Sequence, residues 1–266
     1  MRALEDELGV QLLDRLGRGT TPTRAGTLLL GYARRLLALS REARQAIDQF
    51  QGRVSGELVL GGSTIPGEYV LPSLIGVFRS KYPDVSIALR IGGSRQVQEW
   101  VEQGHVEIGV VGAVPVGRAL ESRQLMADDL VLAVPPEHAW VARKTVSIQD
   151  VKREPLILRE RGSGSRETLE LGLAALGLDL GAFNVVAEIA STQAVKQAVR
   201  AGLGVSFISG RAVEDECRAR LLACVKVRDL NVTRAFHLVT HRDRSRSPLA
   251  QAFLAFVESQ PTARSS

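Results

Sequence analysis

The sequence has few of the residues that build metal centres and redox sites. Its 266 residues include two cysteines and four histidines, and the histidines are scattered along the chain. Cys217 and Cys224 are seven positions apart, a separation that matches no metal-binding pattern. We therefore expect two free thiols, as in proteins of reducing compartments, and neither a metal nor another cofactor.

Long apolar runs are also absent. The longest apolar stretches, residues 129–135 and 202–208, have the length of a strand, whereas a membrane-spanning helix needs about 20 apolar residues. The first residues are charged, and no apolar segment typical of a secretory signal follows them. We expect a cytoplasmic protein without a membrane partner. A net charge of +5 is compatible with an anionic partner but does not require one.

Common catalytic and nucleotide-binding patterns are missing as well. No turn has the Gly-Lys-Ser/Thr of a P-loop or a Gly-x-Gly-x-x-Gly dinucleotide pattern, and no serine lies in a Gly-x-Ser-x-Gly elbow. The charged clusters have simple interpretations: a solvated turn at residues 128–129, an exposed helix face at 214–216 and a solvated loop at 242–246. Because no acid–base pair or nucleophile is visible, we expect no enzyme, and an enzyme on a binding-protein-like fold ranks last.

The N-terminal part reads as short elements followed by one long helix. A helix over residues 2–8 ends at Gly9, a strand is expected at 10–13, and Thr23 is a good N-cap for the next helix. That helix, over about 24–51, carries a heptad seam, which favours a dimerisation helix over a helix packed on its own domain. The seam residues are Leu29, Ala33, Leu36, Ser40, Ala43, Ile47 and Phe50.

From Glu57 onward, strand patterns alternate with helix patterns. Such alternation predicts an α/β fold with parallel sheets covered by helices on both faces. No repeat of fixed period and no low-complexity tract interrupts it.

Four turns in this region share one character, because each follows a strand and leads into a helix with small hydroxyl residues at the turn. They lie at residues 61–67, 92–95, 162–166 and 190–193. Free backbone N–H groups at a helix start favour a carboxylate, sulfate or phosphate. One such turn alone is usually a simple helix cap, but four turns in two α/β halves favour a shared ligand site beyond the carboxyl ends of the strands.

At this point the sequence resembles the LysR-type transcriptional regulators, and the resemblance covers essentially the whole chain. Residues 2–15 resemble the end of that family's recognition helix and the first wing strand, and residues 17–26 resemble the wing and the start of the linker helix. The other segments that carry the resemblance are 56–63, 71–74, Phe78, 82–84, 106–112 and 198–205.

The resemblance implies a domain organisation. Residues 1–23 would be a partial winged helix-turn-helix, 24–52 the linker and dimerisation helix, and 57–266 a complete effector-binding domain. That domain would consist of two Rossmann-like subdomains of type 2 periplasmic-binding-protein architecture: subdomain I at 57–133 and 235–260, and subdomain II at 134–234.

The family also implies the site residues. A small anionic effector would lie between the subdomains, where helix starts of the first face those of the second above a floor at residues 111–113. The implied effector-binding residues are Ser63, Thr64, Ser94, Val111, Gly112, Ala113, Ser163, Ser165 and Thr192. The implied DNA-binding residues are Arg2, Arg15, Arg18 and Arg24, which contact phosphates and do not read bases.

In one respect the sequence departs from the family. The first two helices of the winged helix-turn-helix and the start of its recognition helix are absent, and base edges are read by that start. We expect a transcription regulator that binds promoter DNA as a homodimer or homotetramer under the control of its effector. The alternative is an effector-binding module that has lost sequence-specific DNA binding and acts by forming mixed oligomers with intact regulators.

Overall fold

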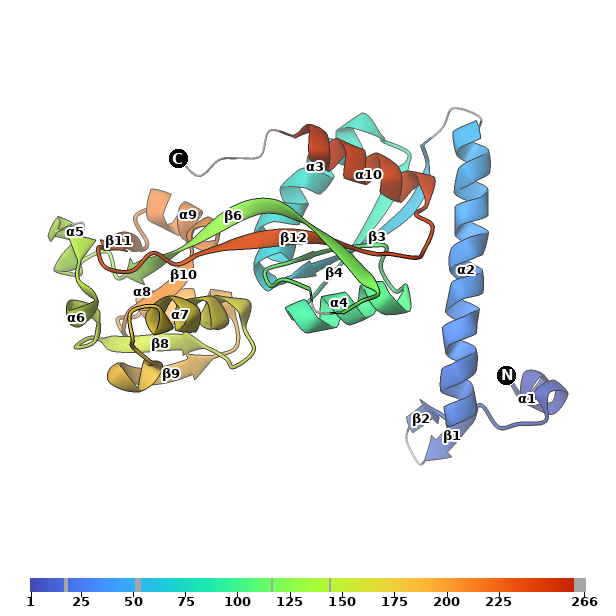
Figure 1. The fold of residues 1–266 in the computed structure, drawn as a ribbon, viewed down its shortest axis with the longest axis horizontal. Helices are drawn as coiled ribbons and strands as arrows, with labels where there is room; N and C mark the ends of the chain where they lie inside the picture. Colours follow the sequence, from blue (N-terminus) through green and yellow to red (C-terminus); the bar gives the residue numbers. More distant parts are fainter. Residues whose placement is uncertain (17–18, 51–53, 116, 144, 261–266) are drawn as a thin grey trace.

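The computed structural model describes residues 1–16, 19–50, 54–115, 117–143 and 145–260. Two lobes of strands and helices lie side by side, and a long helix stands beside one of them (Figure 1). The lobe next to that helix, residues 56–129 and 233–259, is called subdomain I. Residues 130–232 form subdomain II. No helix in the described part of the chain is both long and apolar enough to cross a membrane.

The N-terminal segment consists of α1 (Arg2–Leu8) and a hairpin of β1 (Leu13–Leu16) and β2 (Gly19–Pro22). As predicted, α1 ends at Gly9, whose φ of 64° is left-handed. The strand expected at residues 10–13 is wrong, because pairing starts only at Leu13. Glu5 explains the delay: its Oε1 accepts the backbone N–H groups of Leu12 and Leu13 at 2.8 and 3.1 Å, so this stretch is tied to α1.

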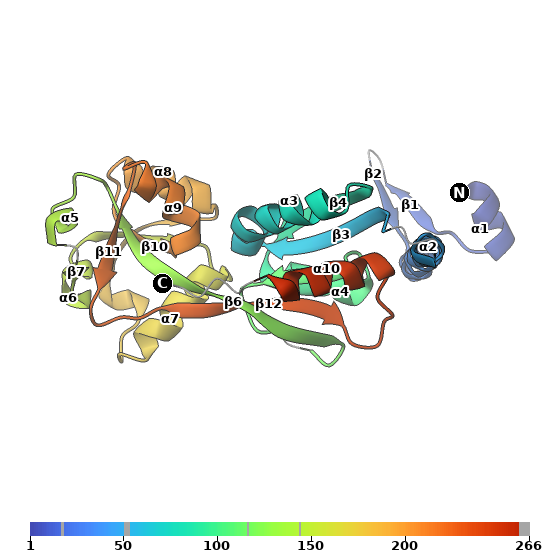
Figure 2. The same cartoon turned by 90° about the horizontal axis from the view of Figure 1, so that it is seen from above.

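The long helix α2 (Arg24–Phe50) begins where the sequence predicts. Thr23 Oγ1 accepts the N–H of Gly26 at 3.0 Å and donates to the carbonyl of Gln11 at 2.7 Å. On the seam, the side chains of Leu36 and Ile47 are 67% and 60% exposed, so α2 presents an uncovered apolar face. Figure 2 looks nearly along α2 and shows it outside the two lobes.

We predict that Thr23→Ala lowers the free energy of unfolding of α2 by about 1 kcal/mol, because the variant loses an N-cap. Hydrogen exchange of the amides at residues 26–30 measures this local effect. Thr20→Ala, which truncates an exposed residue of β2, is the matched control. Equal exchange rates in the two variants would show that the cap contributes nothing.

Subdomain I is a five-stranded sheet with helices on both faces. Its order is β4-β3-β5-β12-β6, in which β4, β3 and β5 are parallel and β12 is antiparallel to both of its neighbours. The strands are β3 (Gly56–Ser63), β4 (Val85–Gly92), β5 (Ile108–Val111), β6 (Leu120–Val134) and β12 (Thr233–His241). The helices are the π-helical turn η1 (Pro66–Val70), α3 (Leu71–Lys81), α4 (Ser94–Gln103) and α10 (Pro248–Ser259).

Alternation along β3 distributes its side chains between two cores. Leu58 and Leu60 are buried against α3 and α10, where the rings of Phe78 and Phe253 meet edge to face with centroids 5.1 Å apart. Val59 packs on the opposite face, in the cluster formed by α4. Figure 1 shows α3 and α10 above this sheet and α4 below it. Helices therefore cover both faces of this sheet, so a ligand site is expected at the ends of its strands.

Subdomain II continues the same topology around its own core. Here β6 pairs with β10 and β11, β11 pairs with β7, and β8 and β9 form a separate parallel pair. An isolated bridge between Leu156 of β8 and Val205, which directly precedes β10, joins this pair to the rest. The strands are β7 (Thr145–Val146), β8 (Pro155–Arg159), β9 (Asn184–Ile189), β10 (Ser206–Ser209) and β11 (Ala223–Val227). The helices are α5 (Trp140–Arg143), α6 (Ile148–Val151), α7 (Gly164–Ala174), η2 (Leu180–Ala182), α8 (Thr192–Arg200) and α9 (Gly210–Arg218).

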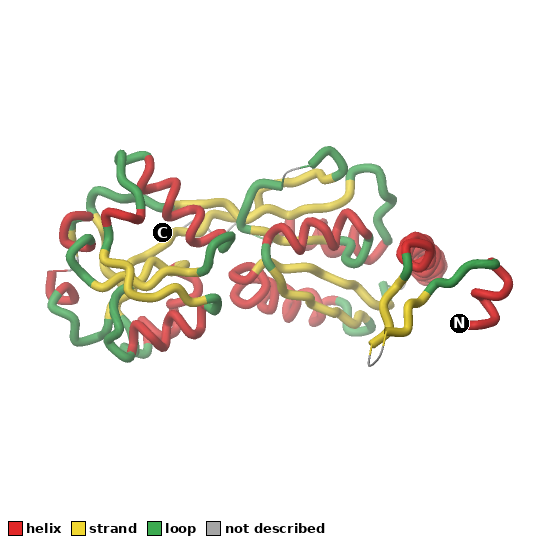
Figure 3. The backbone as a smooth tube through the Cα atoms, turned by 90° about the horizontal axis from the view of Figure 1, so that it is seen from below, coloured by secondary structure: helices red, strands yellow, loops and turns green. Residues whose placement is uncertain are grey.

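Two strands, β6 and β12, join the subdomains (Figures 2 and 3). Residues 120–129 of β6 pair with β12, whereas residues 130–134 pair with β10 and β11. The pairing therefore changes at Leu130, whose N–H donates to the carbonyl of Val232 at 2.8 Å. Two crossovers were predicted near residues 134 and 234, and they lie near 130 and 232. Strands expected separately near 125 and 130 form one strand.

One prediction about the cysteines is wrong. The structure joins Cys217 and Cys224 in a disulfide and leaves no free cysteine. Cys217 lies in the last turn of α9 and Cys224 near the start of β11, and the turn between them brings their Cα atoms within 6.6 Å. That distance is in the range of bonded pairs. The seven-residue separation gives no hint of this, because the reversal of the chain is a tertiary feature.

Candidate functional site

A buried ion pair lies where the two crossover strands leave subdomain I. Arg234 of β12 donates from Nε to Oδ2 of Asp128 on β6 at 2.9 Å. The Asp128 side chain is fully buried and also accepts the hydroxyl of Ser209 at 2.6 Å. The sequence prediction of a solvated turn at Asp128 is therefore wrong. Because a buried charge is costly without its partner, Asp128 and Arg234 fix each other in place.

The other end of the Arg234 side chain faces two glycines. A Cβ atom on Gly112 would lie 3.5 Å from Arg234 Nη1, and a Cβ on Gly164 would lie 3.3 Å from the same nitrogen. The guanidinium also lies 5.1 Å from the centre of the Phe236 ring. Only 7% of the Arg234 side chain is exposed, and its Nη2, 2.9 Å from Asp128 Oδ2, makes no aligned hydrogen bond. A buried cation therefore lies between the end of β5 and the start of α7, with its Nη1 facing the two glycines and its Nη2 beside Asp128.

The start of α7 supplies further positive potential. Its N-cap, Ser163, accepts no hydrogen bond from the first turn of the helix. Ser163 and Ser165 are both buried, and Gly164 lies between them. Uncapped N–H groups at a helix N-terminus attract anions, and the helix dipole acts in the same direction. Arg234 and the α7 N-terminus therefore provide charge and hydrogen bonds at one place.

A second arginine stands close to the first. Arg159, at the end of β8, donates from Nη1 to Thr192 Oγ1 and pairs with the carboxylate of Glu160 at 2.8 Å. Burial lowers the pKa of Arg234, Asp128 raises it, and the nearby charge of Arg159 lowers it. The two cations repel each other across the site. A bound anion would relieve this repulsion, which makes the site suited to negatively charged ligands.

The structure brings some of the predicted site residues together and uses others differently. Ser63 Oγ accepts the N–H of Gly112 at 3.1 Å, which holds the end of β3 beside the end of β5. Val111 is fully buried, and its side chain packs in the cluster beneath α4. The hydroxyl of Thr192 is taken by Arg159, and Ser191 caps α8 by accepting the N–H of Ala194 at 3.3 Å.

Three further residues were predicted to bind the effector. Thr64, Ser94 and Ala113 are half-buried. Ser94 opens α4 behind Gly93, an N-cap without a side-chain hydrogen bond. Because Ser63 and Gly92 are neighbours in the β3–β4 register, Ser94 belongs to the same edge of the sheet.

One further contact joins the two subdomains. Lys196 of α8 is buried, and its Nζ donates to the carbonyl of Ala212 at 2.9 Å and to Glu216 Oε1 at 2.6 Å. The same Nζ lies 5.1 Å from the centre of the Tyr69 ring in η1. Glu216 is therefore not the exposed residue that the sequence suggested, whereas Glu214 beside it is exposed, as expected. A cation–π contact links the two subdomains beside the site.

Sequence reasoning missed Arg234, Asp128, Arg159 and Lys196. The search followed glycine- and serine-rich turns, whereas these four residues lie in strands or inside a helix. A usable signal was present: an acidic or basic residue within an apolar strand pattern is costly to bury unless it is paired. Asp128 precedes the apolar run of β6 and carries this signal, but its partner 106 positions away cannot be read from the sequence.

The predicted DNA-binding residues lie far from this site. Arg2 opens α1 and Arg24 opens α2, and both are exposed. In Figure 1 these two helix starts gather at the end of α2 that points away from the lobes. Arg18 and the side chain of Arg15 lie outside the described residues.

Comparisons with known proteins agree on one family. Residues 51–261 match the family model of the LysR substrate binding domain. A protein of Cyanidium caldarium named "Probable RuBisCO transcriptional regulator" is 33% identical over 253 residues, which are 94% of this chain and 80% of that protein. A protein of the same name from Trichormus variabilis is also 33% identical over 253 residues, 75% of its length.

Solved structures share the fold. Full-length CbnR complexed with its target DNA superposes with a TM-score of 0.73 at 24% identity, covering 97% of this chain and 87% of CbnR. The regulatory domain of CcmR from Synechocystis PCC6803, in complex with 2-PG, has a TM-score of 0.69 at 24% identity and covers 76% of this chain and 96% of that domain. From the family model and the curated relatives, this chain belongs to the LysR family of transcriptional regulators.

Proposed function

We propose that this LysR-type regulator is controlled by a small anionic effector that binds between the subdomains on Arg234 and the N-terminus of α7. The observation that carries the proposal is the buried guanidinium of Arg234, whose Nη1 faces Gly112 and Gly164. Arg159 adds positive charge, and the two glycines leave room for a ligand atom to approach. The complex of CcmR with 2-PG shows a relative holding such an anion.

The same arginine connects the ligand to the hinge. Arg234 and Asp128 lie on the two crossover strands, and Asp128 also holds Ser209 of subdomain II. An anion that draws Arg234 towards α7 weakens its pair with Asp128. Because a ligand shifts a conformational equilibrium only by binding two states unequally, this exchange of partners supplies the required difference.

DNA binding and oligomerisation belong to the proposal as well. The exposed seam of α2, which includes Leu36 and Ile47, would pair with a second copy to form a homodimer, and a homotetramer would join two such pairs. Arg2 and Arg24 would contact phosphates of promoter DNA. A DNA retention assay that shows strong salt dependence would support this part. Retention that is absent under all salt conditions would favour a module acting through mixed oligomers.

The experiment is a thermal-shift titration with 2-phosphoglycolate and with inorganic phosphate. At a hundredfold excess over Kd, binding stabilises the folded state by about 2.7 kcal/mol. We predict that Asp128→Asn/Arg234→Gln weakens the binding of 2-phosphoglycolate about 10- to 100-fold, because a charged hydrogen-bond donor is lost while the neutral pair still fits.

The matched control is Asp128→Asn alone, which retains Arg234 and frees it from its carboxylate partner. It should bind the anion at least as tightly as the wild type. The proposal fails if neither anion stabilises the wild type, or if the double variant responds as strongly as the single one. Turnover of either compound would instead favour an enzyme.

A further inference from the structure

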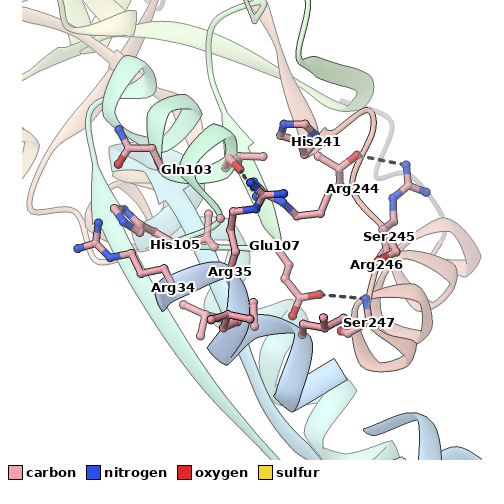
Figure 4. A pocket seen from close by; sticks show the side chains of 18 of the residues that line it. Arg34, Arg35, Gln103, His105, Glu107, His241, Arg244, Ser245, Arg246 and Ser247 are labelled. Carbon is pink, nitrogen blue, oxygen red and sulfur yellow. Dashed lines mark hydrogen bonds between the residues drawn. The ribbon is translucent and has the colours of Figure 1, made fainter. Parts of the chain in front are cut away.

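A cavity of about 690 Å³ lies between α2 and subdomain I, well away from Arg234 (Figure 4). It is bounded by α2, the turn between α4 and β5, and the loop between β12 and α10. A neighbouring cavity of about 490 Å³ shares part of this lining. Small-molecule sites in proteins have volumes of about 300–1,000 Å³. The residues common to both cavities are Tyr32, Arg34, Arg35, Gln103 and Arg244.

Arginine side chains from opposite elements meet across this cavity, and His105 lies among them. Arg34 and Arg35 come from α2, whereas His105 and Arg244 belong to subdomain I, and Figure 4 shows these four residues on adjoining walls. Burial and the charge of Arg34 lower the pKa of His105, and burial and the charge of Arg35 lower the pKa of Arg244. Like charges therefore oppose each other where the linker helix meets the domain.

The ion pairs recorded for the described residues include none with Arg34, Arg35 or Arg244. Arg244 donates instead to the carbonyls of Val101 and Glu102, both at 3.2 Å, at the end of α4. It is thus held in place and is not the solvated loop residue that the sequence suggested. Nε2 of His105 is buried and has no hydrogen-bond partner in the described part of the chain.

Carboxylates also line the cavity. Glu57, Glu107 and Asp243 are lining residues, and Glu107 accepts the N–H of Ser247 at the start of α10, at 3.1 Å. The remaining arginine of the lining, Arg246, is ion-paired with Glu121. In the described part of the chain, the arginines of this lining without an ion pair are therefore Arg34, Arg35 and Arg244.

We propose that this cavity is a second ligand site, which binds a small polyanion carrying two or more phosphate or carboxylate groups. One anionic group would lie near Arg34 and His105 and another near Arg35 and Arg244. Such a ligand replaces the repulsion between the arginines by attraction to its anionic groups. Each anionic group would contact one residue of α2 and one residue of subdomain I, and so join the two. Its binding therefore fixes the linker helix against the domain, independently of the ligand at Arg234.

The test is a calorimetric titration of the full chain with pyrophosphate. The Asp128→Asn/Arg234→Gln background removes the principal anion-binding group of the site between the subdomains, so failure of the earlier proposal cannot be mistaken for failure of this one. In this background we expect saturable binding of one pyrophosphate per chain. Adding Arg34→Gln/Arg35→Gln should weaken it at least tenfold, as expected when charged hydrogen bonds are lost.

The matched control adds Arg200→Gln/Arg228→Gln, which removes two positive charges from exposed positions of subdomain II. This control should bind pyrophosphate as the background does. The proposal is overturned if both added pairs weaken binding equally, or if pyrophosphate does not saturate at millimolar concentration. It is also overturned if Arg34→Gln/Arg35→Gln changes only the oligomeric state in sedimentation, since the cavity would then receive an acidic segment of a second copy.

Discussion

Asp128→Ala should lower the free energy of unfolding by about 3–5 kcal/mol, which is the usual effect of leaving one partner of a buried ion pair without the other. The Arg234 guanidinium would keep its charge at a site where only 7% of the side chain is exposed. Ser209 would also lose the acceptor of its hydroxyl hydrogen bond. Urea denaturation monitored by circular dichroism measures the effect.

A double variant separates the charge from the packing. Asp128→Leu/Arg234→Met replaces the pair by apolar groups, and such replacements of buried pairs are often neutral or stabilising. We expect it to recover most of the stability that Asp128→Ala loses, and at the same time to lose the response to the effector. A double variant as unstable as Asp128→Ala would mean that packing, and not the unpaired charge, causes the loss.

Gly204→Ala should lower the free energy of unfolding by at least about 3 kcal/mol, at the upper end of overpacking effects. A Cβ on Gly204 would lie 2.3 Å from the carbonyl oxygen of Pro155, which is backbone and cannot rotate away. The same carbonyl accepts the N–H of Val205 at 2.8 Å, and this bond holds β8 beside β10. The substitution therefore separates the strand that carries Arg159 from its neighbour.

Gly76→Ala is the matched control for this prediction. Gly76 is exposed inside α3, and a Cβ there has no neighbour within 4 Å. Alanine at a helix interior is more stable than glycine by about 0.5–1 kcal/mol, so this variant should be slightly more stable than the wild type. If Gly204→Ala and Gly76→Ala shift the denaturation midpoint equally, close backbone approach does not explain Gly204.

Much of the fold follows from patterns that are local in the sequence. The alternation of strands and helices from Glu57, the heptad spacing along α2 and the cap at Thr23 each predict one element without reference to the rest of the chain. The same is true of α1, where Leu8 is followed by a left-handed glycine. Misplaced details, such as the start of β1, arise where a side chain like that of Glu5 competes for backbone hydrogen bonds.

The site was harder to predict because its chemistry depends on pairing between distant strands. Turns with serine and glycine indicated one edge of each sheet, and Gly112 and Gly164 approach each other there. The buried ion pair of Asp128 and Arg234 forms only because β6 and β12 run side by side between the subdomains. Local sequence patterns do not reveal this pairing. The hydroxyl oxygens of Ser63 and Thr192, predicted to bind ligand, accept hydrogen bonds from Gly112 and Arg159 in the structure, and each O–H remains able to donate to an anion.

The central claim, that Arg234 and the start of α7 hold the effector, is tested most directly by a crystal structure of the chain with 2-phosphoglycolate. We predict phosphate oxygens within about 3 Å of Arg234 Nη1 and of backbone N–H groups at the start of α7, a normal hydrogen-bond distance. A ligand found only in the cavity beside α2, or one that leaves Arg234 paired with Asp128 and untouched, would contradict the account.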